Sequence, residues 1–422
     1  MSMELVEPFA GIRVVEFGQF VAVPFCGQLL AEGGAEVIKV ENPEGDPNRH
    51  MGEISPKDSR IYISRNRGKR ALPLKLGDPK AEPIINKLLA SADVILMNFR
   101  PGLAQELGLD PEKLISEHPR LVIGEITPFG KAGPDAMLAG MDIVVQARSG
   151  LMAAIGKIED GRPAPGDPVI SDYMAATSLA FGISAALLRR EQTGRGGLVD
   201  VSLMQAAMTL ANNQLVRHEE KDKPKHDAAI EKVNQQRLAA EPYADQLASV
   251  PGIRVHAIRS IYFRTYETAD GTVALACASP ALQSRFNKAL ELTVPEVPIL
   301  TAPTDIVEGL QKQVEEKMRS QPSAHWVSLL NDAGVPISTV KFPMELFEDE
   351  QAEANSMFKL VDHESGQLRV LSPVVHIDGG GFKTRQPTKP FASETKGLLN
   401  ELGFSDREIE SLVADGTTKT ER

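Results

Sequence analysis

Residues 12–210 alternate between short apolar runs and longer helical patterns, and this alternation constrains the fold more than any other feature. The run "IRVVEF" at 12–17 is rich in β-branched residues, and "PFCGQLLAEGG" at 24–34 begins with proline and ends with glycines, as helices do. Further strands are predicted at 36–41, 70–76, 93–99, 120–126 and 198–203. Strands that alternate with helices in this way predict an α/β fold with a mostly parallel sheet covered on both faces.

The chain changes character after residue 215. At 422 residues it exceeds what one hydrophobic core usually covers, so two domains are expected. The segment "RHEEKDKPKHDAAIEKVNQQR" is charged, and a hairpin with its turn at Asp270-Gly271 opens an α+β pattern further on. We therefore predict a large α/β domain at 1–215, a linker at 216–250, a small α+β domain at 251–345, and a return segment with terminal helices at 346–422.

Charge and cysteine content exclude several functions. The net charge of −11 argues against a nucleic-acid partner. Cys26 and Cys277 form no CxxC motif and no histidine pair has metal-ligand spacing, so neither a disulfide framework nor a metal site is expected. The N-terminus lacks the apolar core of a signal peptide, and the longest apolar stretch, "SLAFGISAALL", reads as too short to cross a bilayer. We expect a cytoplasmic protein with no membrane partner.

The first strand–helix–strand unit resembles a dinucleotide site only in part. Glu41 ends the second strand where a ribose-binding acid would lie, but the turn "GQFVAVP" lacks the G-x-G-x-x-G that lets a pyrophosphate approach the backbone. A classical NAD site is therefore not expected. Residues 19–22 remain candidates for ligand contacts, because turns at the carboxyl ends of parallel strands bind ligands in many α/β proteins.

A basic run and a lone acid carry the remaining chemistry. Arg65, Arg67, Lys69 and Arg70 lie within six residues, and they form either a solvated turn or a seat for phosphate groups. Asp172 opens a long helical pattern in "PGDPVISDYMAA". It fits an N-cap or a first-turn acid favoured by the helix dipole, which would keep it ionised. A carboxylate held in this way is also available as a nucleophile for acyl transfer, so the structural and catalytic readings are compatible.

Several motifs in order resemble the class III coenzyme A transferases, the family of formyl-CoA transferase and crotonobetainyl-CoA:carnitine CoA-transferase. The resemblance rests on "GIRVVEFGQFVAVPFCGQLLAEGGAEVIKVENPEGDPNR", "RNRGKRALPLKL", "ADVILMNFRPGLAQELGL", "GMDIVVQARSGLM", "ISDYMAATSLAFGISAALLRREQTGRGGLVDVSLMQAAM" and "LLNELGFSDREIESLVADG". It is dense over 11–210, weaker over 251–345, and returns at the C-terminus. It implies a Rossmann-like large domain, CoA as a substrate with no permanently bound cofactor, and a ring-like subunit interlocked with a second copy.

The resemblance also implies the site. Asp172 matches the catalytic aspartate, which would form an aspartyl anhydride with the donor acyl group and then an aspartyl-CoA thioester, before CoA passes to a carboxylic acid acceptor. The matching CoA contacts are Val21, Ala22, Leu74, Lys75, Asn98, Phe99, Arg100, Met141 and Asp142. Asn42 and Glu106 depart from basic residues that are frequent in the family.

Two alternatives share the resemblance. The α-methylacyl-CoA racemases have this fold but carry a histidine where Met141 lies, so a two-base proton transfer would lack one base here. A catalytically silent CoA-binding relative would not need the carboxylate of Asp172.

Overall fold

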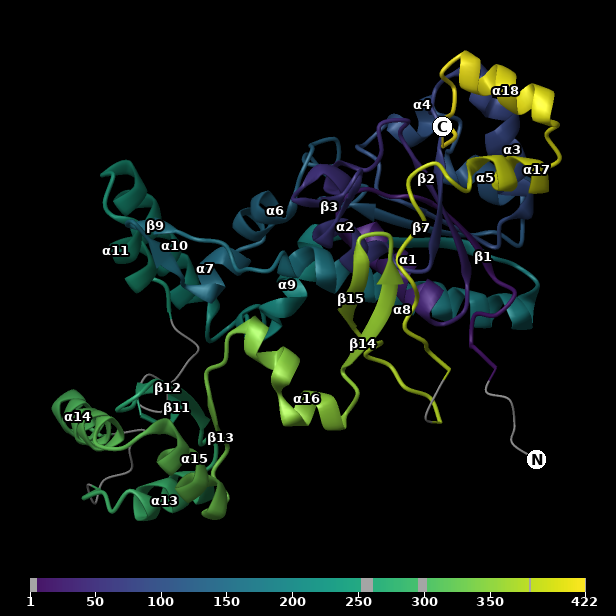
Figure 1. Cartoon of the computed structure of the whole chain (residues 1–422). Helices are drawn as coiled ribbons and strands as arrows, with labels where there is room; N and C mark the ends of the chain where they lie inside the picture. The colour runs from purple at the N-terminus through teal and green to yellow at the C-terminus, as the bar shows by residue number, and fades with distance from the viewer. Residues whose placement is uncertain (1–5, 252–260, 295–301, 379–380, 422) are drawn as a thin grey trace. The chain divides into compact units, whose positions relative to one another are not determined.

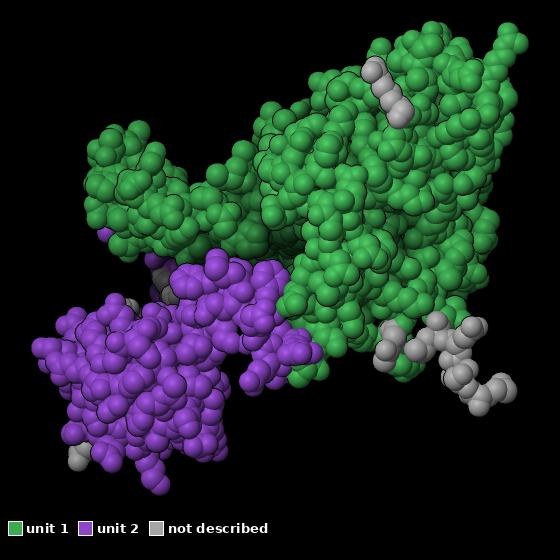
Figure 2. All heavy atoms as spheres, in the orientation of Figure 1, with its two compact units in different colours: residues 1–219, 235–248, 354–422 green, residues 220–234, 249–353 purple. Residues whose placement is uncertain are grey.

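The computed structural model describes residues 6–251, 261–294, 302–378 and 381–421, and these residues divide into two compact units (Figures 1 and 2). Unit 1 comprises residues 1–219, 235–248 and 354–422, and unit 2 comprises residues 220–234 and 249–353. The predicted linker at 216–250 is mostly helical, with α10 at Lys223–Leu238 and α11 at Tyr243–Ala248.

A six-stranded parallel sheet forms the centre of unit 1. Its strand order is β10-β7-β6-β1-β2-β5, so the chain moves outward in one direction from β1 and then in the other direction from β6. The strands are β1 (Arg13–Phe17), β2 (Glu36–Glu41), β5 (Lys69–Pro73), β6 (Val94–Met97), β7 (Val122–Thr127) and β10 (Gly197–Ser202). This is the order of doubly wound nucleotide-binding sheets, and it confirms the predicted α/β fold.

Alternate strand residues enter different cores. Val14 packs against helices α1 (Ala22–Glu32), α8 (Ile170–Thr193) and α9 (Leu203–Leu210), whereas the next residue, Val15, packs on the opposite face of the sheet. The opposite face is covered by α3 (Glu82–Ser91), α5 (Pro111–Glu117), α17 (Thr395–Glu401) and α18 (Asp406–Ala414). Because both faces are buried, the strands read as continuous apolar runs.

Shorter elements complete unit 1. Besides α11, the described residues of unit 1 also form helices α2 (Arg60–Asn66), α4 (Leu103–Glu106), α6 (Asp142–Arg148) and α7 (Leu151–Ile155). Its hairpin strands are β3 (Glu53–Ser55), β4 (Asp58–Ser59), β8 (Ile158–Glu159), β9 (Arg162–Pro163), β14 (Phe358–His363) and β15 (Gly366–Leu371). The β14–β15 hairpin lies inside the segment read from the sequence as a return linker.

Unit 2 is a small α+β body. In the described part of this unit, a three-stranded antiparallel sheet, in the order β11-β12-β13, packs with helices around a core that includes Phe286 and Trp326. The elements are β11 (Phe263–Glu267), β12 (Thr272–Ala276), α13 (Pro280–Ala289), α14 (Thr304–Arg319), α15 (Ser323–Asp332) and β13 (Ile337–Thr339), followed by α16 (Glu350–Ala354). The predicted turn at Asp270-Gly271 connects β11 to β12.

Helix α8 corrects one expectation about length. It has 24 residues and is long and apolar enough, by length and composition, to cross a membrane. The apolar run "SLAFGISAALL" is by itself too short to cross a bilayer, but α8 extends beyond this run at both ends. In the protein 39% of the most apolar window of α8 is buried. One such helix is weak evidence for a membrane span, because a core helix of a soluble protein can have the same length and composition.

Candidate active site

A cavity of about 490 Å³ lies at the carboxyl ends of the strands of unit 1. All six strands contribute residues at or just after their ends, and the chain reverses its direction of winding here, between β1 and β6. Doubly wound sheets bind ligands at this switch point. Eight of the nine predicted CoA contacts line the cavity together with Asp172: Val21, Ala22, Leu74, Lys75, Asn98, Phe99, Arg100 and Met141. Asp142 does not line it.

The turn after β1 is held in place by three side chains. Asn98 accepts a hydrogen bond from the backbone N–H of Gln19 at 3.0 Å and donates one to its carbonyl oxygen at 3.0 Å. Asn48 donates to the carbonyl oxygen of Phe20 at 2.6 Å, and Lys39 donates to that of Gly18 at 2.6 Å. Phe20 adopts a left-handed backbone with φ of 65°, which non-glycine residues rarely adopt. These hydrogen bonds support the turn in this conformation, and the side-chain amide of Asn98 binds the backbone of Gln19.

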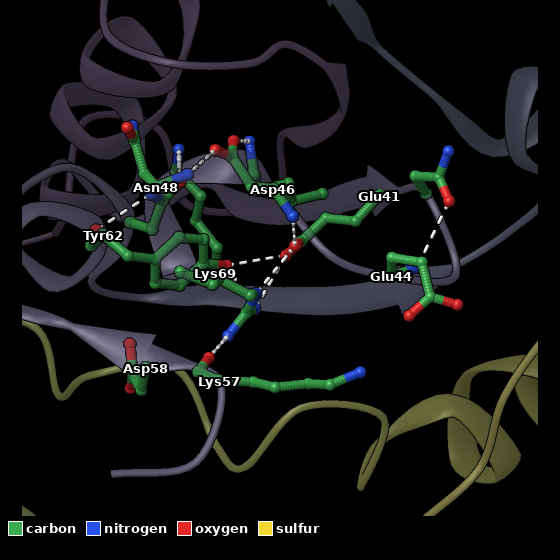
Figure 3. A network of polar contacts seen from close by, with 12 residues as sticks. Glu41, Glu44, Asp46, Asn48, Lys57, Asp58, Tyr62 and Lys69 are labelled. Carbon is green, nitrogen blue, oxygen red and sulfur yellow. Dashed lines mark hydrogen bonds and ion pairs between the residues drawn. The ribbon is translucent and has the colours of Figure 1, made fainter. Parts of the chain in front are cut away.

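Beneath this turn lies a buried network of charges (Figure 3). Glu16 is fully buried between Lys39, at 2.9 Å, and Lys69, at 2.8 Å. Burial alone would lower the pKa of Lys39, but Glu16, Asp46 and Glu41 raise it above its ordinary value. Burial dominates at Lys69 and lowers its pKa to about 8. These groups neutralise one another inside the fold, and one of them supports the turn that lines the cavity.

Glu41 is part of the same network, so it is not a ribose-binding acid. Arg49 contacts both carboxylate oxygens at 2.7 Å, and the hydroxyl of Tyr62 donates to Glu41 at 2.7 Å. Burial would raise the pKa of Glu41, but the guanidinium of Arg49 lowers it to about 2. All of these groups are buried, which agrees with the absence of a dinucleotide motif.

Asp172 is the third residue of α8 and is half-buried at the cavity wall. Asp172 lies in the first turn of α8, as one reading of the sequence predicts, but it is not the N-cap, which is Val169. Asp142 caps α8 from another helix, because its Oδ1 accepts hydrogen bonds from the backbone N–H of Ser171 at 2.9 Å and of Asp172 at 3.4 Å. Burial, and secondly the charge of Asp142, raise the pKa of Asp172 to about 7, while Arg65 opposes the shift.

Asp142 is itself held by a buried glutamine. Gln146 donates to the second carboxylate oxygen of Asp142 at 2.5 Å, and the Gln146 side chain exchanges hydrogen bonds with the backbone of Gly166 at 2.9 and 3.1 Å. The start of α6, the loop before α8 and the start of α8 are thus connected. Asp142, predicted as a CoA contact, instead accepts hydrogen bonds from the backbone at the start of the helix that carries Asp172.

The two residues that depart from the family pattern, Asn42 and Glu106, lie in different places. Asn42 lines the cavity. Glu106 lies 3.7 Å from Arg100 at an exposed position, so it reduces the local positive charge that Arg100 supplies at the cavity.

Sequence reasoning missed the wall after β7. Ile126, Thr127, Pro128 and Leu203 also line the cavity. The rule that selected residues 19–22 after β1 applies equally to the ends of β7 and β10 and could have found them. Among the described residues no group of three or more histidine, cysteine, aspartate or glutamate side chains could hold a metal ion.

Comparisons with known proteins define the class. The profile of CoA-transferase family III matches residues 9–393. The chain is 30% identical over 424 residues to cinnamoyl-CoA:phenyllactate CoA-transferase of Clostridium sporogenes, covering 96% of both chains. It is 27% identical over 435 residues to succinyl-CoA:glutarate CoA-transferase of Homo sapiens, covering 98% of this chain and 91% of that one. The protein therefore belongs to CoA-transferase family III and is a CoA-transferase.

Solved structures agree with this fold. The orthorhombic form of Rv3272 from Mycobacterium tuberculosis has a TM-score of 0.74 at 24% identity, covering 93% of this chain and 99% of that chain. A CAIB/BAIF family protein from Brucella suis also has a TM-score of 0.74 at 24% identity, covering 94% and 99%. At this identity the likeness shows the fold alone.

Proposed function

We propose that Asp172 is the nucleophile that accepts the acyl group and then CoA. Its carboxylate oxygen attacks the thioester carbon of the donor, a C–O bond forms, the C–S bond breaks, and CoA leaves as a thiolate. The thiolate then attacks the carboxyl carbon of Asp172 in the mixed anhydride. A C–S bond forms, the anhydride C–O bond breaks, and the donor acid leaves as a carboxylate.

The second half of the cycle reverses these steps with another acid. The acceptor carboxylate attacks the aspartyl-CoA thioester, which releases the CoA thiolate and forms a new anhydride. The thiolate attacks the acceptor's acyl carbon, giving the product acyl-CoA and the free carboxylate of Asp172. No step requires a proton transfer, because each nucleophile attacks as an anion and each leaving group departs as an anion.

One observation carries this proposal: among the described residues that line the cavity, Asp172 is the single carboxylate, and neither histidine nor cysteine joins it. A half-buried carboxylate with a pKa near 7 is more basic than an ordinary aspartate and hence a stronger nucleophile once ionised. Met141 supplies no base at the position where a racemase would need one, which favours acyl transfer over proton exchange.

The cavity also offers groups suited to CoA. Lys75 and Arg100 are largely exposed cations at its wall, and Val21 and Ala22 place the start of α1 there. Cations and the free N–H groups of a helix start both attract phosphate oxygens. We assign these residues to CoA binding on that basis.

Trapping experiments test the mechanism. The enzyme is incubated with an acyl-CoA, treated with hydroxylamine, digested and analysed by mass spectrometry; we expect a hydroxamate at Asp172 that is absent from Asp172→Asn. The trapping rate should rise with pH and reach half its maximum near pH 7, since only the ionised carboxylate attacks. An unmodified Asp172 peptide after incubation with several active donors would rule the mechanism out.

The relatives' names define the first substrate panel. They include cinnamoyl-CoA, succinyl-CoA and acetyl-CoA as donors, and phenyllactate, L-malate, glutarate and oxalate as acceptors. All the acceptors are carboxylic acids, both aromatic and dicarboxylic. We propose the same substrate class here, and turnover with each donor and acceptor pair measures the preference.

We also propose that the protein is an interlocked homodimer in the cytoplasm. Phe181 and Leu188 on α8 are 76% and 65% exposed and lie seven residues apart on one helix face, which a second copy would cover. Cys26 and Cys277 are both buried free thiols, as suits a reducing compartment. Light scattering at micromolar concentration should give twice the chain mass; a monomer would refute the dimer.

A further inference from the structure

The fold separates the four residues of the basic run at 65–70. Arg67 lies 3.1 Å from Glu32, Lys69 is buried against Glu16, and Arg70 contacts Glu36 and Glu401 at 2.9 and 2.7 Å. These three cations are thus paired with carboxylates of the same chain, so of the two alternatives left open by the sequence they do not form the phosphate site. Arg65, at the end of α2, has no ion pair with any carboxylate in the part of the chain that the structure describes.

The guanidinium of Arg65 is held beside the nucleophile. Its Nε donates to the hydroxyl of Tyr173 at 3.4 Å, and its carbon lies 5.8 Å from the centroid of the same ring. Phe25 fixes that ring by an edge contact with centroids 4.9 Å apart. Tyr173 follows Asp172 directly in α8, and Arg65 is the cation that lowers the pKa of Asp172 against burial and Asp142.

Arg65 and Tyr173 lie outside the residues that line the cavity. This placement matters because CoA, once transferred to Asp172, must still be held while the acceptor arrives. The acceptor therefore needs an approach to Asp172 that CoA does not fill. It is also an anion, and it approaches a position where Asp142 already contributes negative charge. A cation without a carboxylate partner is the group that such an approach requires.

We propose that Arg65 binds the carboxylate of the exchanged acid and orients it toward the carboxyl carbon of Asp172. The guanidinium fork holds one oxygen of the acid and leaves the other free to attack, and the same contact receives the donor acid as it departs. This inference rests on the proposed role of Asp172 and adds the group that recognises the acid. The expected ligands are free carboxylates, so an ester or amide of the same acid should bind without help from Arg65.

The test compares Arg65→Met, Arg65→Lys and the matched control Arg60→Met. Arg60 is the first residue of α2 and is exposed, so its substitution removes the same charge from the same helix. The donor and acceptor are the fastest pair from the panel above, assayed at about pH 8.5, where Asp172 is ionised in every variant. We expect Arg65→Met to raise the acceptor KM roughly 30-fold or more, which is the usual effect of removing one partner of a close charge pair.

Two further readouts separate this role from a structural one. Arg65→Lys should recover part of the acceptor KM, because it keeps the charge and loses the fork, while Arg60→Met should stay within about threefold of the wild type. Hydroxylamine trapping at Asp172 with saturating donor should stay within about threefold in Arg65→Met, since the acylation of Asp172 precedes the release or arrival of any free acid.

The possible failures are distinguishable. An acceptor KM within about threefold of the wild type in Arg65→Met would overturn the assignment of Arg65. An equal loss of trapping and turnover in both Arg65 variants, with unchanged acceptor KM, would also overturn it and would indicate a role in the fold of the site. Absence of any modification at Asp172 in the wild type would count against the aspartyl mechanism itself.

Discussion

Replacing Asp172 by asparagine should stabilise the protein, and the stabilisation should grow with pH. Burial and the charge of Asp142 raise the pKa of Asp172 from 3.8 to about 7. Below pH 3.8 the carboxyl is protonated in both the folded and the unfolded chain. As pH rises toward 7 the unfolded chain ionises first, so the wild type loses stability, and the loss is complete above the folded pKa.

The pKa values set the magnitude. At about 1.36 kcal/mol for each pKa unit, the ionised carboxylate destabilises the native state by roughly 4 kcal/mol above pH 7. The asparagine variant does not ionise and so avoids this loss. For a unit of about 300 residues, the melting temperature of Asp172→Asn should exceed that of the wild type by roughly 6 °C at about pH 8 and roughly 2 °C at about pH 5.

Thermal unfolding followed by circular dichroism at the two pH values measures this difference without ligand. Asp200→Asn is the matched control, because Asp200 is an exposed residue of β10 in the same unit. The control should show no comparable dependence on pH. Equal melting temperatures for Asp172→Asn and the wild type at both pH values would refute the argument that the site holds Asp172 at an energetic disadvantage.

Three further predictions concern the groups around the site. Asp142→Asn should lower the pKa of Asp172, so hydroxylamine trapping should reach half its maximum at a lower pH; an unchanged profile would show that Asp142 acts only as a cap. Lys39→Met should destabilise the protein by roughly 3–5 kcal/mol in denaturant unfolding, because Glu16 loses a buried partner; a variant as stable as the wild type would contradict this. Cys26 should resist thiol reagents in the native protein, since burial and the nearby charge of Glu16 raise its pKa. Rapid labelling would contradict its description as a buried, unreactive thiol.

The sheet could be predicted because its signals are local. Val14 and Val15 lie in one apolar run, and burial on both faces is why the run shows no polar alternation. The β14–β15 hairpin was read as a linker, because residues such as Leu360 and Leu371 are exposed and no buried apolar run marks the strands. The candidate site was placed by the family resemblance and by the rule that doubly wound sheets bind ligands at the carboxyl ends of their strands.

The electrostatics of the site could not be predicted in the same way. The pattern at Asp172 suggested a residue held ionised by its own helix, but the N–H groups at that helix start are directed to Asp142, which lies 30 residues earlier in the chain. The four cations of the basic run look alike in sequence. Their difference depends on glutamates as distant as residue 401, which only the folded chain brings close.

The destabilisation of Asp172 has a consequence for the proposed reaction. Acylation converts the carboxylate into a neutral anhydride and then a neutral thioester, so the repulsion from Asp142 and the penalty of burial are both relieved when the covalent bond forms. The same interactions that lower the stability of the free enzyme therefore favour the intermediates over the free carboxylate. Once Asp172 is acylated it is neutral and no longer attracts the guanidinium of Arg65. The positive charge of Arg65 is then available to the carboxylate of the acceptor. In the proposed mechanism, burial and the charge of Asp142 favour the transfer of CoA to Asp172, and Arg65 binds the acid that then takes CoA from it.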